Sequence, residues 1–115
     1  MQKSIPIHDA IAKSDRYIVH VLREDQADLS DLFARSDLSR EEQFNNLEYR
    51  LESGCPVLDD AFVRFHCTRH DVFDGGDHSI HLGLVYDVSK GIPGRPVVYH
   101  QRAYYGIGRH IADHH

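Results

Sequence analysis

Polar and apolar residues alternate along two neighbouring stretches of the chain, and a period of two is typical of β-strands. In residues 78–89 the more apolar row is His78, Ile80, Leu82, Leu84, Tyr86 and Val88, and the opposite row is Ser79, His81, Gly83, Val85, Asp87 and Ser89. In residues 61–72 one row is Ala61, Val63, Phe65 and Cys67, and a more polar row is Phe62, Arg64, His66, Thr68 and His70. The pattern predicts two strands, with His78 at the edge of the core at the start of the more apolar row.

The Gly75-Gly76 pair between these stretches predicts a tight turn, so we expect residues 61–72 and 78–89 to form an antiparallel hairpin. Periodicity and chain-breaking residues predict the other elements. These are helices at 7–14 and 25–35, strands at 17–22, 47–51 and 97–100, a polar loop or frayed turn at 36–46, a break at 54–56 and a loop at 90–96. Several strands with two short helices suit a small barrel or a partly open sheet, in the mainly β, α+β class.

Composition indicates one soluble domain. The 115 residues weigh 13.2 kDa and carry a net charge of −5 without a basic stripe, which argues against a nucleic-acid partner. No apolar run approaches the roughly 20 residues of a membrane span, and no basic and apolar leader opens the sequence. We therefore expect no membrane contact and a cytoplasmic location. Cys55 and Cys67 have no CxxC spacing, and we expect reduced thiols, with Cys67 buried.

Candidate chemistry concentrates at Gly75-Gly76-Asp77-His78, where two titratable side chains stand at the mouth of a strand. Paired glycines let a ligand approach the backbone closely, and an imidazole there can bind a carboxamide or a phosphate. The alternative is a plain hairpin turn with a surface histidine, and these four residues alone do not decide between the two.

The other histidines predict no metal site. His66 and His70 share a strand face but stand about 13 Å apart at the rise of a β-strand, which is too far for one ion. His20 lies within a strand among apolar residues, and we expect it to be a hydrogen-bonded core histidine.

An ordered set of motifs over residues 5–106 resembles one known family. The set comprises Tyr17-Ile18-Val19-His20-Val21-Leu22, Asp25-Gln26, Leu29-Ser30-Asp31-Leu32-Phe33, Gly54-Cys55-Pro56-Val57-Leu58, Phe65-His66-Cys67, Gly75-Gly76-Asp77-His78, Gly83-Leu84-Val85, Pro96-Val97-Val98-Tyr99-His100 and Tyr104. In this order they are similar to the flavin reductase-like domain, a family of NAD(P)H:flavin oxidoreductases that often serve two-component monooxygenases. Members usually begin with further strands that line the flavin site, and this chain looks like the domain without them.

The resemblance implies a split β-barrel, truncated at the N-terminus, that pairs as a homodimer. It implies hydride transfer from NADH or NADPH to FMN or FAD, with His78 as the catalytic residue and a monooxygenase as a partner. Gly76, Asp77 and His78 would belong to the cofactor site, and we expect Asp77 to fix the turn through its own backbone. Tyr104 resembles an aromatic residue that closes over that site, and the alternative, a half-buried tyrosine with its hydroxyl in water, stays open.

We expect one partial flavin reductase-like domain at 1–108 and a disordered, His-rich tail at 109–115. The second hypothesis is a non-catalytic domain that forms a dimer and has a structural role or binds flavin weakly.

Overall fold

The computed structural model describes residues 15–113, and strands dominate this part of the chain. A three-stranded antiparallel sheet has the order β1-β4-β5, formed by Arg16–Val21, Val63–Gly75 and His78–Lys90. Two small hairpins pair β2 (Arg50–Glu52) with β3 (Cys55–Val57) and β6 (Val98–His100) with β7 (Ala103–Tyr105). The helical elements are the 3₁₀ turn η1 (Glu24–Gln26), α2 (Ala27–Ala34) and α3 (Arg40–Phe44).

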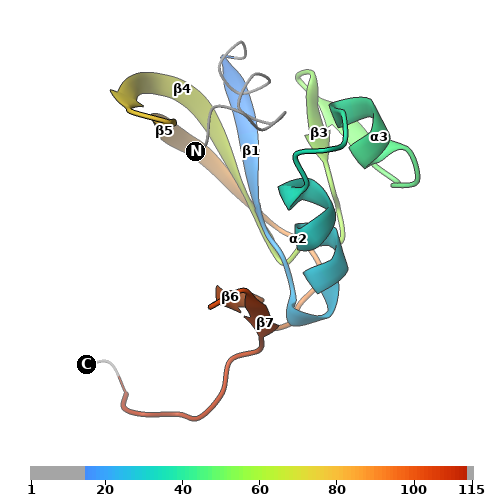
Figure 1. The fold of residues 1–115 in the computed structure, drawn as a ribbon, viewed down its shortest axis with the longest axis vertical. Helices are drawn as coiled ribbons and strands as arrows, with labels where there is room; N and C mark the ends of the chain where they lie inside the picture. Colours follow the sequence, from blue (N-terminus) through green and yellow to red (C-terminus); the bar gives the residue numbers. More distant parts are fainter. Residues whose placement is uncertain (1–14, 114–115) are drawn as a thin grey trace.

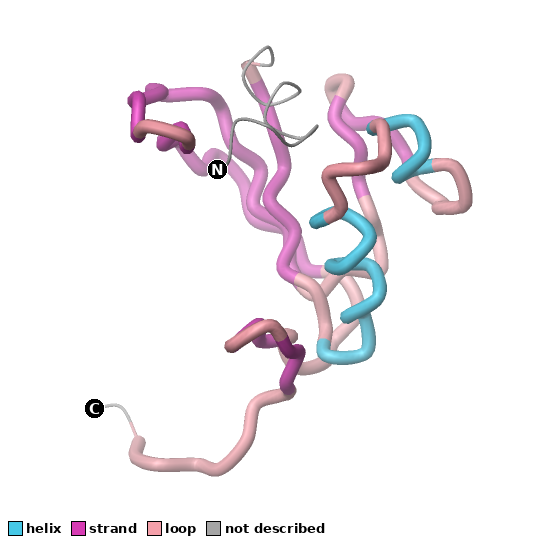
Figure 2. The backbone as a smooth tube through the Cα atoms, in the orientation of Figure 1, coloured by secondary structure: helices cyan, strands magenta, loops and turns pink. Residues whose placement is uncertain are grey.

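The long β4–β5 hairpin curves away from the rest of the molecule, whereas α2 and α3 lie on the other side of β1, beside β3 (Figure 1). Figure 2 shows the helical segments gathered on one side of the three-stranded sheet. The β6–β7 hairpin lies near the start of α2, far from the β4–β5 turn, and the chain after β7 runs away from the body (Figure 1). The β4–β5 turn and the β6–β7 hairpin therefore lie at different ends of the molecule (Figure 1).

Most predicted elements are confirmed. The strand at 17–22 is β1, the helix at 25–35 is η1 followed by α2, and the hairpin of residues 61–72 and 78–89 is β4–β5. The prediction of a strand-rich fold with two short helices is also confirmed. The helix expected at 7–14 lies outside the described residues.

The stretch 36–46 is not a loop, because it contains α3. Ser39 Oγ accepts a hydrogen bond from Glu42 N–H, and Glu42 Oε1 accepts one from Ser39 N–H, both at 3.1 Å. This reciprocal capping box is a helix-start signal that the sequence carries as Ser-x-x-Glu. Gln43 then fixes the helix, because its buried amide donates to the carbonyl oxygens of Phe33 and Arg35 at the end of α2.

The expected break at 54–56 is confirmed only at Gly54, which lies in a turn, because Cys55 and Pro56 belong to β3. β2 turns into β3 through Ser53 and Gly54, whose φ angles are 51° and 79°. Two consecutive residues with positive φ make the type of turn that matches the twist of a two-residue hairpin, and glycine at the second position favours it. The strand expected at 97–100 is β6, and its partner β7 was not predicted.

The prediction that the apolar row of β5 faces the core is wrong. Ile80, Leu82, Leu84, Tyr86 and Val88 are exposed, and so is His78, whereas Ser79 from the opposite row is buried. Two register shifts, between His66 and Cys67 and between Arg69 and Asp71, interrupt strict alternation along the hairpin. β5 is also an edge strand, and no element of the described chain covers its apolar row.

In the polar row of β4, Arg64 and His66 are buried, whereas His70 is exposed. Arg64 is 5% exposed, and its guanidinium donates to the carbonyl oxygens of Leu58, Asp59 and Lys90 and to Ser89 Oγ. A buried charge is tolerated when hydrogen bonds replace its hydration. Arg64 thereby ties the segment after β3 to the end of β5. The small apolar core beside it comprises Cys55, Val57, Leu58, Ala61 and Cys67.

Both thiols are free, as predicted, and Cys67 is buried, which raises its pKa. His20 is the predicted hydrogen-bonded histidine. Its Nε2 accepts a hydrogen bond from Leu58 N–H at 3.0 Å, so the neutral ring carries its proton on Nδ1, 3.3 Å from the Ile18 carbonyl oxygen. Burial lowers the pKa of His20, and the nearby charge of Arg64 acts in the same direction.

Candidate functional site

The β4–β5 turn has the geometry that its glycines predict. Gly75 pairs with His78 across the hairpin, which leaves Gly76 and Asp77 as a two-residue loop. Gly76 has φ +78°, and Asp77 is not among the described residues with positive φ. A positive φ at the first loop position only is the type II′ pattern, which requires glycine there. The sequence therefore fixes the direction in which Asp77 and His78 leave the turn.

Asp77 and His78 are in direct contact. Asp77 Oδ1 lies 2.7 Å from His78 Nδ1, and the side chains are 83% and 52% exposed. The expectation that Asp77 fixes the turn through its own backbone stays a prediction, and its carboxylate in addition contacts the neighbouring imidazole. His78 lies at the tip of the hairpin rather than at the edge of the core.

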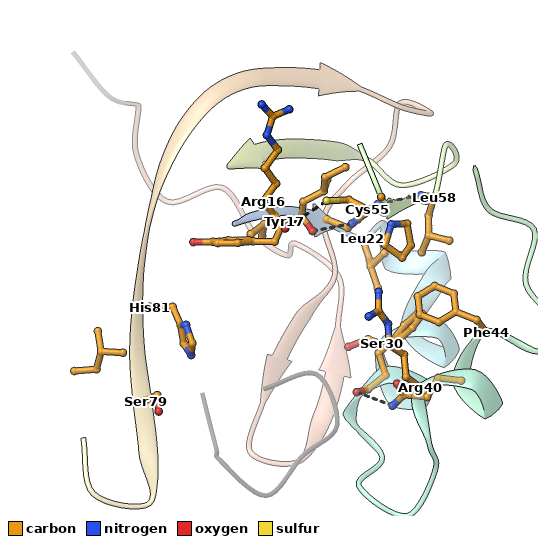
Figure 3. A pocket seen from close by; sticks show the side chains of 18 residues that line it. Arg16, Tyr17, Leu22, Ser30, Arg40, Phe44, Cys55, Leu58, Ser79 and His81 are labelled. Carbon is orange, nitrogen blue, oxygen red and sulfur yellow. Dashed lines mark hydrogen bonds between the residues drawn. The ribbon is translucent and has the colours of Figure 1, made fainter. Parts of the chain in front are cut away.

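A cavity of about 800 Å³ opens beside this hairpin, between the sheet and the helices (Figure 3). Ser79 and His81 face it from β5, Arg16 and Tyr17 from β1, and Arg40 and Phe44 from α3 (Figure 3). The wall thus continues directly from His78 through Ser79, Ile80 and His81. Gly76, Asp77, His78 and Tyr104 themselves do not line it.

The cavity has a cationic lining although the chain is acidic overall. Its described lining includes the guanidinium groups of Arg16 and Arg40 and the imidazoles of His81 and the neutral His20, but no aspartate or glutamate, whereas the chain carries a net charge of −5. Aromatic and apolar side chains make up most of the remaining wall. A volume of this size with a few convergent polar groups is typical of small-molecule sites. The lining fits a flat ligand with negative charge.

Tyr17 forms part of the aromatic wall through a close approach to β5. A Cβ at position 83 would overlap the Tyr17 hydroxyl group and lie 2.8 Å from its Cζ, so Gly83 makes room for the ring. Burial raises the pKa of Tyr17, and its proximity to Cys67 adds to this effect. Tyr17 is therefore a neutral, flat surface facing the cavity.

Tyr104 is not near the turn within one chain. It lies on β7, where its hydroxyl group donates to Asp31 Oδ1 of α2 at 3.4 Å, and its ring centroid lies 5.2 Å from that of Tyr99. The β6–β7 hairpin and the β4–β5 turn lie at opposite ends of the molecule in Figure 1. Its ring is half-buried and its hydroxyl group contacts Asp31, so both interpretations of this tyrosine stay open.

Sequence reasoning missed the basic residues of the cavity. Arg16 directly precedes the apolar strand, and Arg40 belongs to a helix that was taken as a loop, so neither stood out as a candidate. The capping signal Ser39-x-x-Glu42 would have placed Arg40 on the first turn of a helix. His81 was assigned to the polar row of β5 but not to a site.

The described residues contain no group of three or more histidine, cysteine or acidic side chains that could hold a metal ion. Within the same residues, no helix is long and apolar enough to cross a membrane.

The chain is similar to proteins of one family. The sequence profile of the family described as "Flavin reductase like domain" matches residues 1–108. The reductase subunit HsaB of a flavin-dependent monooxygenase from Mycobacterium tuberculosis is 34% identical over 101 residues, which cover 85% of this chain and 52% of that protein. This chain thus spans about half the length of that relative.

Solved structures agree with the sequence match. A flavin reductase domain protein from Arthrobacter sp. FB24 superposes with a TM-score of 0.85 at 24% identity, over 98% of this chain and 69% of that one. The flavin reductase HpaC in complex with NADP⁺ superposes with a TM-score of 0.73 at 31% identity, over 84% of this chain and 60% of that one. The flavin reductase-like fold is thereby confirmed, and the chain belongs to the flavin reductase like domain family.

Proposed function

We propose that this protein reduces FMN or FAD with NADH or NADPH. The observation that carries the proposal is the Gly-Asp-His turn at the end of a hairpin whose next three residues line a cationic, aromatic cavity. Family membership supports the same activity, and the similarity to HpaC, whose structure holds NADP⁺, supports a nicotinamide nucleotide.

The residues that line the cavity are chemically suited to these cofactors. Flavin and nicotinamide nucleotides combine flat rings with phosphate groups, and the lining offers aromatic faces together with two arginines. Arginine binds phosphate through paired N–H donors, and aromatic rings stack on flat heterocycles. Repulsion from carboxylates is small, because none of the described lining residues is acidic.

The bound cofactors would carry the electron pair themselves. The chain has the simpler tasks of binding the rings, orienting them and excluding water. We assign Ser79, Ile80 and His81 of β5 to the wall that separates the bound rings from solvent. Tyr17 would lie on the opposite side of the rings. His78 would contact the nicotinamide carboxamide at the rim, where Gly76 leaves room for the ring. Tyr104 stays a candidate contact that only a second chain could bring to this rim.

We further propose that the reduced flavin serves a monooxygenase and that the protein acts as a homodimer in the cytoplasm. The first part is supported by HsaB, which is named as the reductase subunit of a flavin-dependent monooxygenase. The second is supported by the exposed apolar row of the edge strand β5. The third is supported by the two free cysteines, since reducing compartments preserve thiols.

Flavin binding and turnover test the proposal together. Purified protein should quench the fluorescence of added FMN or FAD with micromolar affinity and then oxidise NADH or NADPH. His78→Ala should lower kcat/KM for the nucleotide by about ten-fold, the cost of one hydrogen bond, and leave flavin affinity unchanged. His70→Ala is the matched control, because His70 is an exposed histidine on the same hairpin. Equal turnover by the His78 variant and the parent would remove His78 from the mechanism.

The second candidate function is a dimeric module that binds flavin weakly or not at all. The exposure of His78 at the hairpin tip favours it, because a catalytic imidazole is more often enclosed. Absence of fluorescence quenching with both flavins would support this function over the reductase.

A further inference from the structure

We propose that Asp77 is a positioning residue that keeps the His78 proton on Nδ1 and so presents Nε2 as a hydrogen-bond acceptor. The inference deepens the proposed function, and it rests on that function only for the identity of the ring that Nε2 meets. The tautomer itself is a property of this chain and can be measured without any cofactor.

The contact between the two side chains fixes which nitrogen is protonated. An ionised carboxylate can only accept hydrogen bonds, and Asp77 Oδ1 lies 2.7 Å from His78 Nδ1. Nδ1 must therefore carry a proton for this contact to be a hydrogen bond. In the neutral imidazole the other nitrogen, Nε2, then holds a lone pair and no proton.

The free nitrogen is available to a ligand. Within the part of the chain that the structure describes, His78 Nε2 has no hydrogen-bond partner, and the side chain is half exposed. The residues that follow it, Ser79 to His81, line the cavity. An acceptor at the rim selects a ligand that offers an N–H group, and the carboxamide of a nicotinamide ring offers one.

The turn makes the pairing possible without a long side chain. Gly76 takes the positive φ of the loop, so Asp77 keeps an ordinary backbone conformation directly before β5. Successive residues of a strand point to opposite faces, but Asp77 lies in the loop and can reach its neighbour.

The strength of the effect is limited by solvent. Pairs of exposed charged groups are screened, and a contact of this exposure shifts an equilibrium by at most about five-fold. This is enough to change the predominant tautomer but too little to hold the hairpin together. Asp77 should therefore affect nucleotide binding without affecting folding.

A second histidine in the chain provides an internal control. His110 Nε2 lies 3.0 Å from Asp113 Oδ1, and both side chains are exposed. The same argument assigns the proton of His110 to Nε2, the opposite nitrogen from His78. Two exposed Asp–His pairs in one molecule are thus expected to show opposite tautomers.

The tautomers can be read from the ¹⁵N chemical shifts of the imidazole rings at about pH 8.5, above the range in which histidine ordinarily titrates. The parent protein should show a protonated Nδ1 at His78, assigned by its loss in His78→Gln. Asp77→Ala should move the proton towards Nε2, Asp77→Asn should fall between the two, and Asp113→Ala should change His110 alone. A proton on Nε2 of His78 in the parent, or no change in Asp77→Ala, would overturn the proposal.

Kinetics separate this inference from the proposed activity. Asp77→Ala should raise KM for NADH or NADPH three- to five-fold at unchanged kcat, unchanged flavin affinity and unchanged thermal midpoint, within the limit for an exposed pair of about five-fold. Asp113→Ala should alter none of these. A changed tautomer with an unchanged KM would overturn the role in nucleotide binding. If the protein proves not to turn over at all, the proposed function fails, and the ¹⁵N shifts still decide whether Asp77 sets the tautomer.

Discussion

His20 joins β1 to the end of β3 through one neutral imidazole, which makes stability depend on pH. Burial lowers its pKa below the ordinary value of 6.5, and the contact with Leu58 N–H requires an unprotonated Nε2. The unfolded chain therefore takes up the proton first as the pH falls. The stability that His20 contributes is fully present above about pH 6.5 and is lost as the pH falls through the lower, folded-state value.

His20→Gln isolates this effect, because glutamine can accept from Leu58 N–H and does not titrate. The free energy of unfolding of the parent should fall more steeply between pH 7 and pH 5 than that of the variant, as measured by urea unfolding at each pH. The other histidines are common to both proteins and cancel in the comparison. Parallel curves for parent and variant would show that His20 is not a neutral structural histidine.

The hairpins differ in whether glycine occupies the turn positions that have positive φ angles. Gly76 and Gly54 occupy positions with positive φ, but the β6–β7 turn places Gln101 and Arg102 at φ 48° and 64°. A side chain in this region costs about 1–2 kcal/mol, and Asn-Gly is the pair that such turns prefer. The turn of the β6–β7 hairpin is therefore strained, because both of its residues carry side chains at positive φ.

Replacing the turn with Gln101→Asn and Arg102→Gly should stabilise the protein by about 1 kcal/mol, because glycine adopts the positive φ without strain. Thermal and urea unfolding measure the gain. The reversed pair, Gln101→Gly with Arg102→Asn, is the matched control and should gain less. A loss of stability in the Asn-Gly variant would contradict the turn geometry.

The positions of helices and strands could be predicted from the sequence better than the side of each strand that faces solvent. The Gly75-Gly76 turn and the two long strands were predictable, because a glycine turn between two alternating runs specifies a hairpin. The exposed side of β5 was not, because two register shifts and an uncovered edge depend on contacts between distant segments. The helix α3 was predictable from Ser39 and Glu42, but its few apolar residues hid it.

Within residues 15–113, the molecule exposes an apolar surface, the row of Ile80, Leu82, Leu84, Tyr86 and Val88 on β5. An edge strand of this kind offers both unpaired backbone groups and apolar area to a second chain. We expect the protein to be a dimer, with a mass twice the 13.2 kDa of one chain in light scattering after size exclusion.

Leu84→Asp should shift the dimer towards the monomer by at least ten-fold in the dissociation constant, because it would bury a charge in the interface. Leu84 is 62% exposed within one chain, so folding of the chain should tolerate the change. Ile111→Asp is the control, since Ile111 is 89% exposed beyond the last strand. A parent protein that stays monomeric at all concentrations would contradict the dimer.

The site could be predicted only in part. The Gly-Asp-His turn could be recognised as a candidate site, because its residues are adjacent in the sequence and two of them are titratable. The cavity did not, because Arg16, Tyr17, Arg40 and His81 come from three different elements and meet only in the folded chain. The sequence places Asp77 next to His78, but it does not predict the hydrogen bond between their side chains, because that bond depends on the turn type.

Reduction of bound flavin by a nicotinamide nucleotide is the decisive test of the reductase function. Purified protein with one equivalent of FMN or FAD should lose the visible absorbance of the oxidised flavin when NADH or NADPH is added without oxygen, and far faster than free flavin does. A rate no faster than that of free flavin, with both flavins and both nucleotides, would contradict the reductase function.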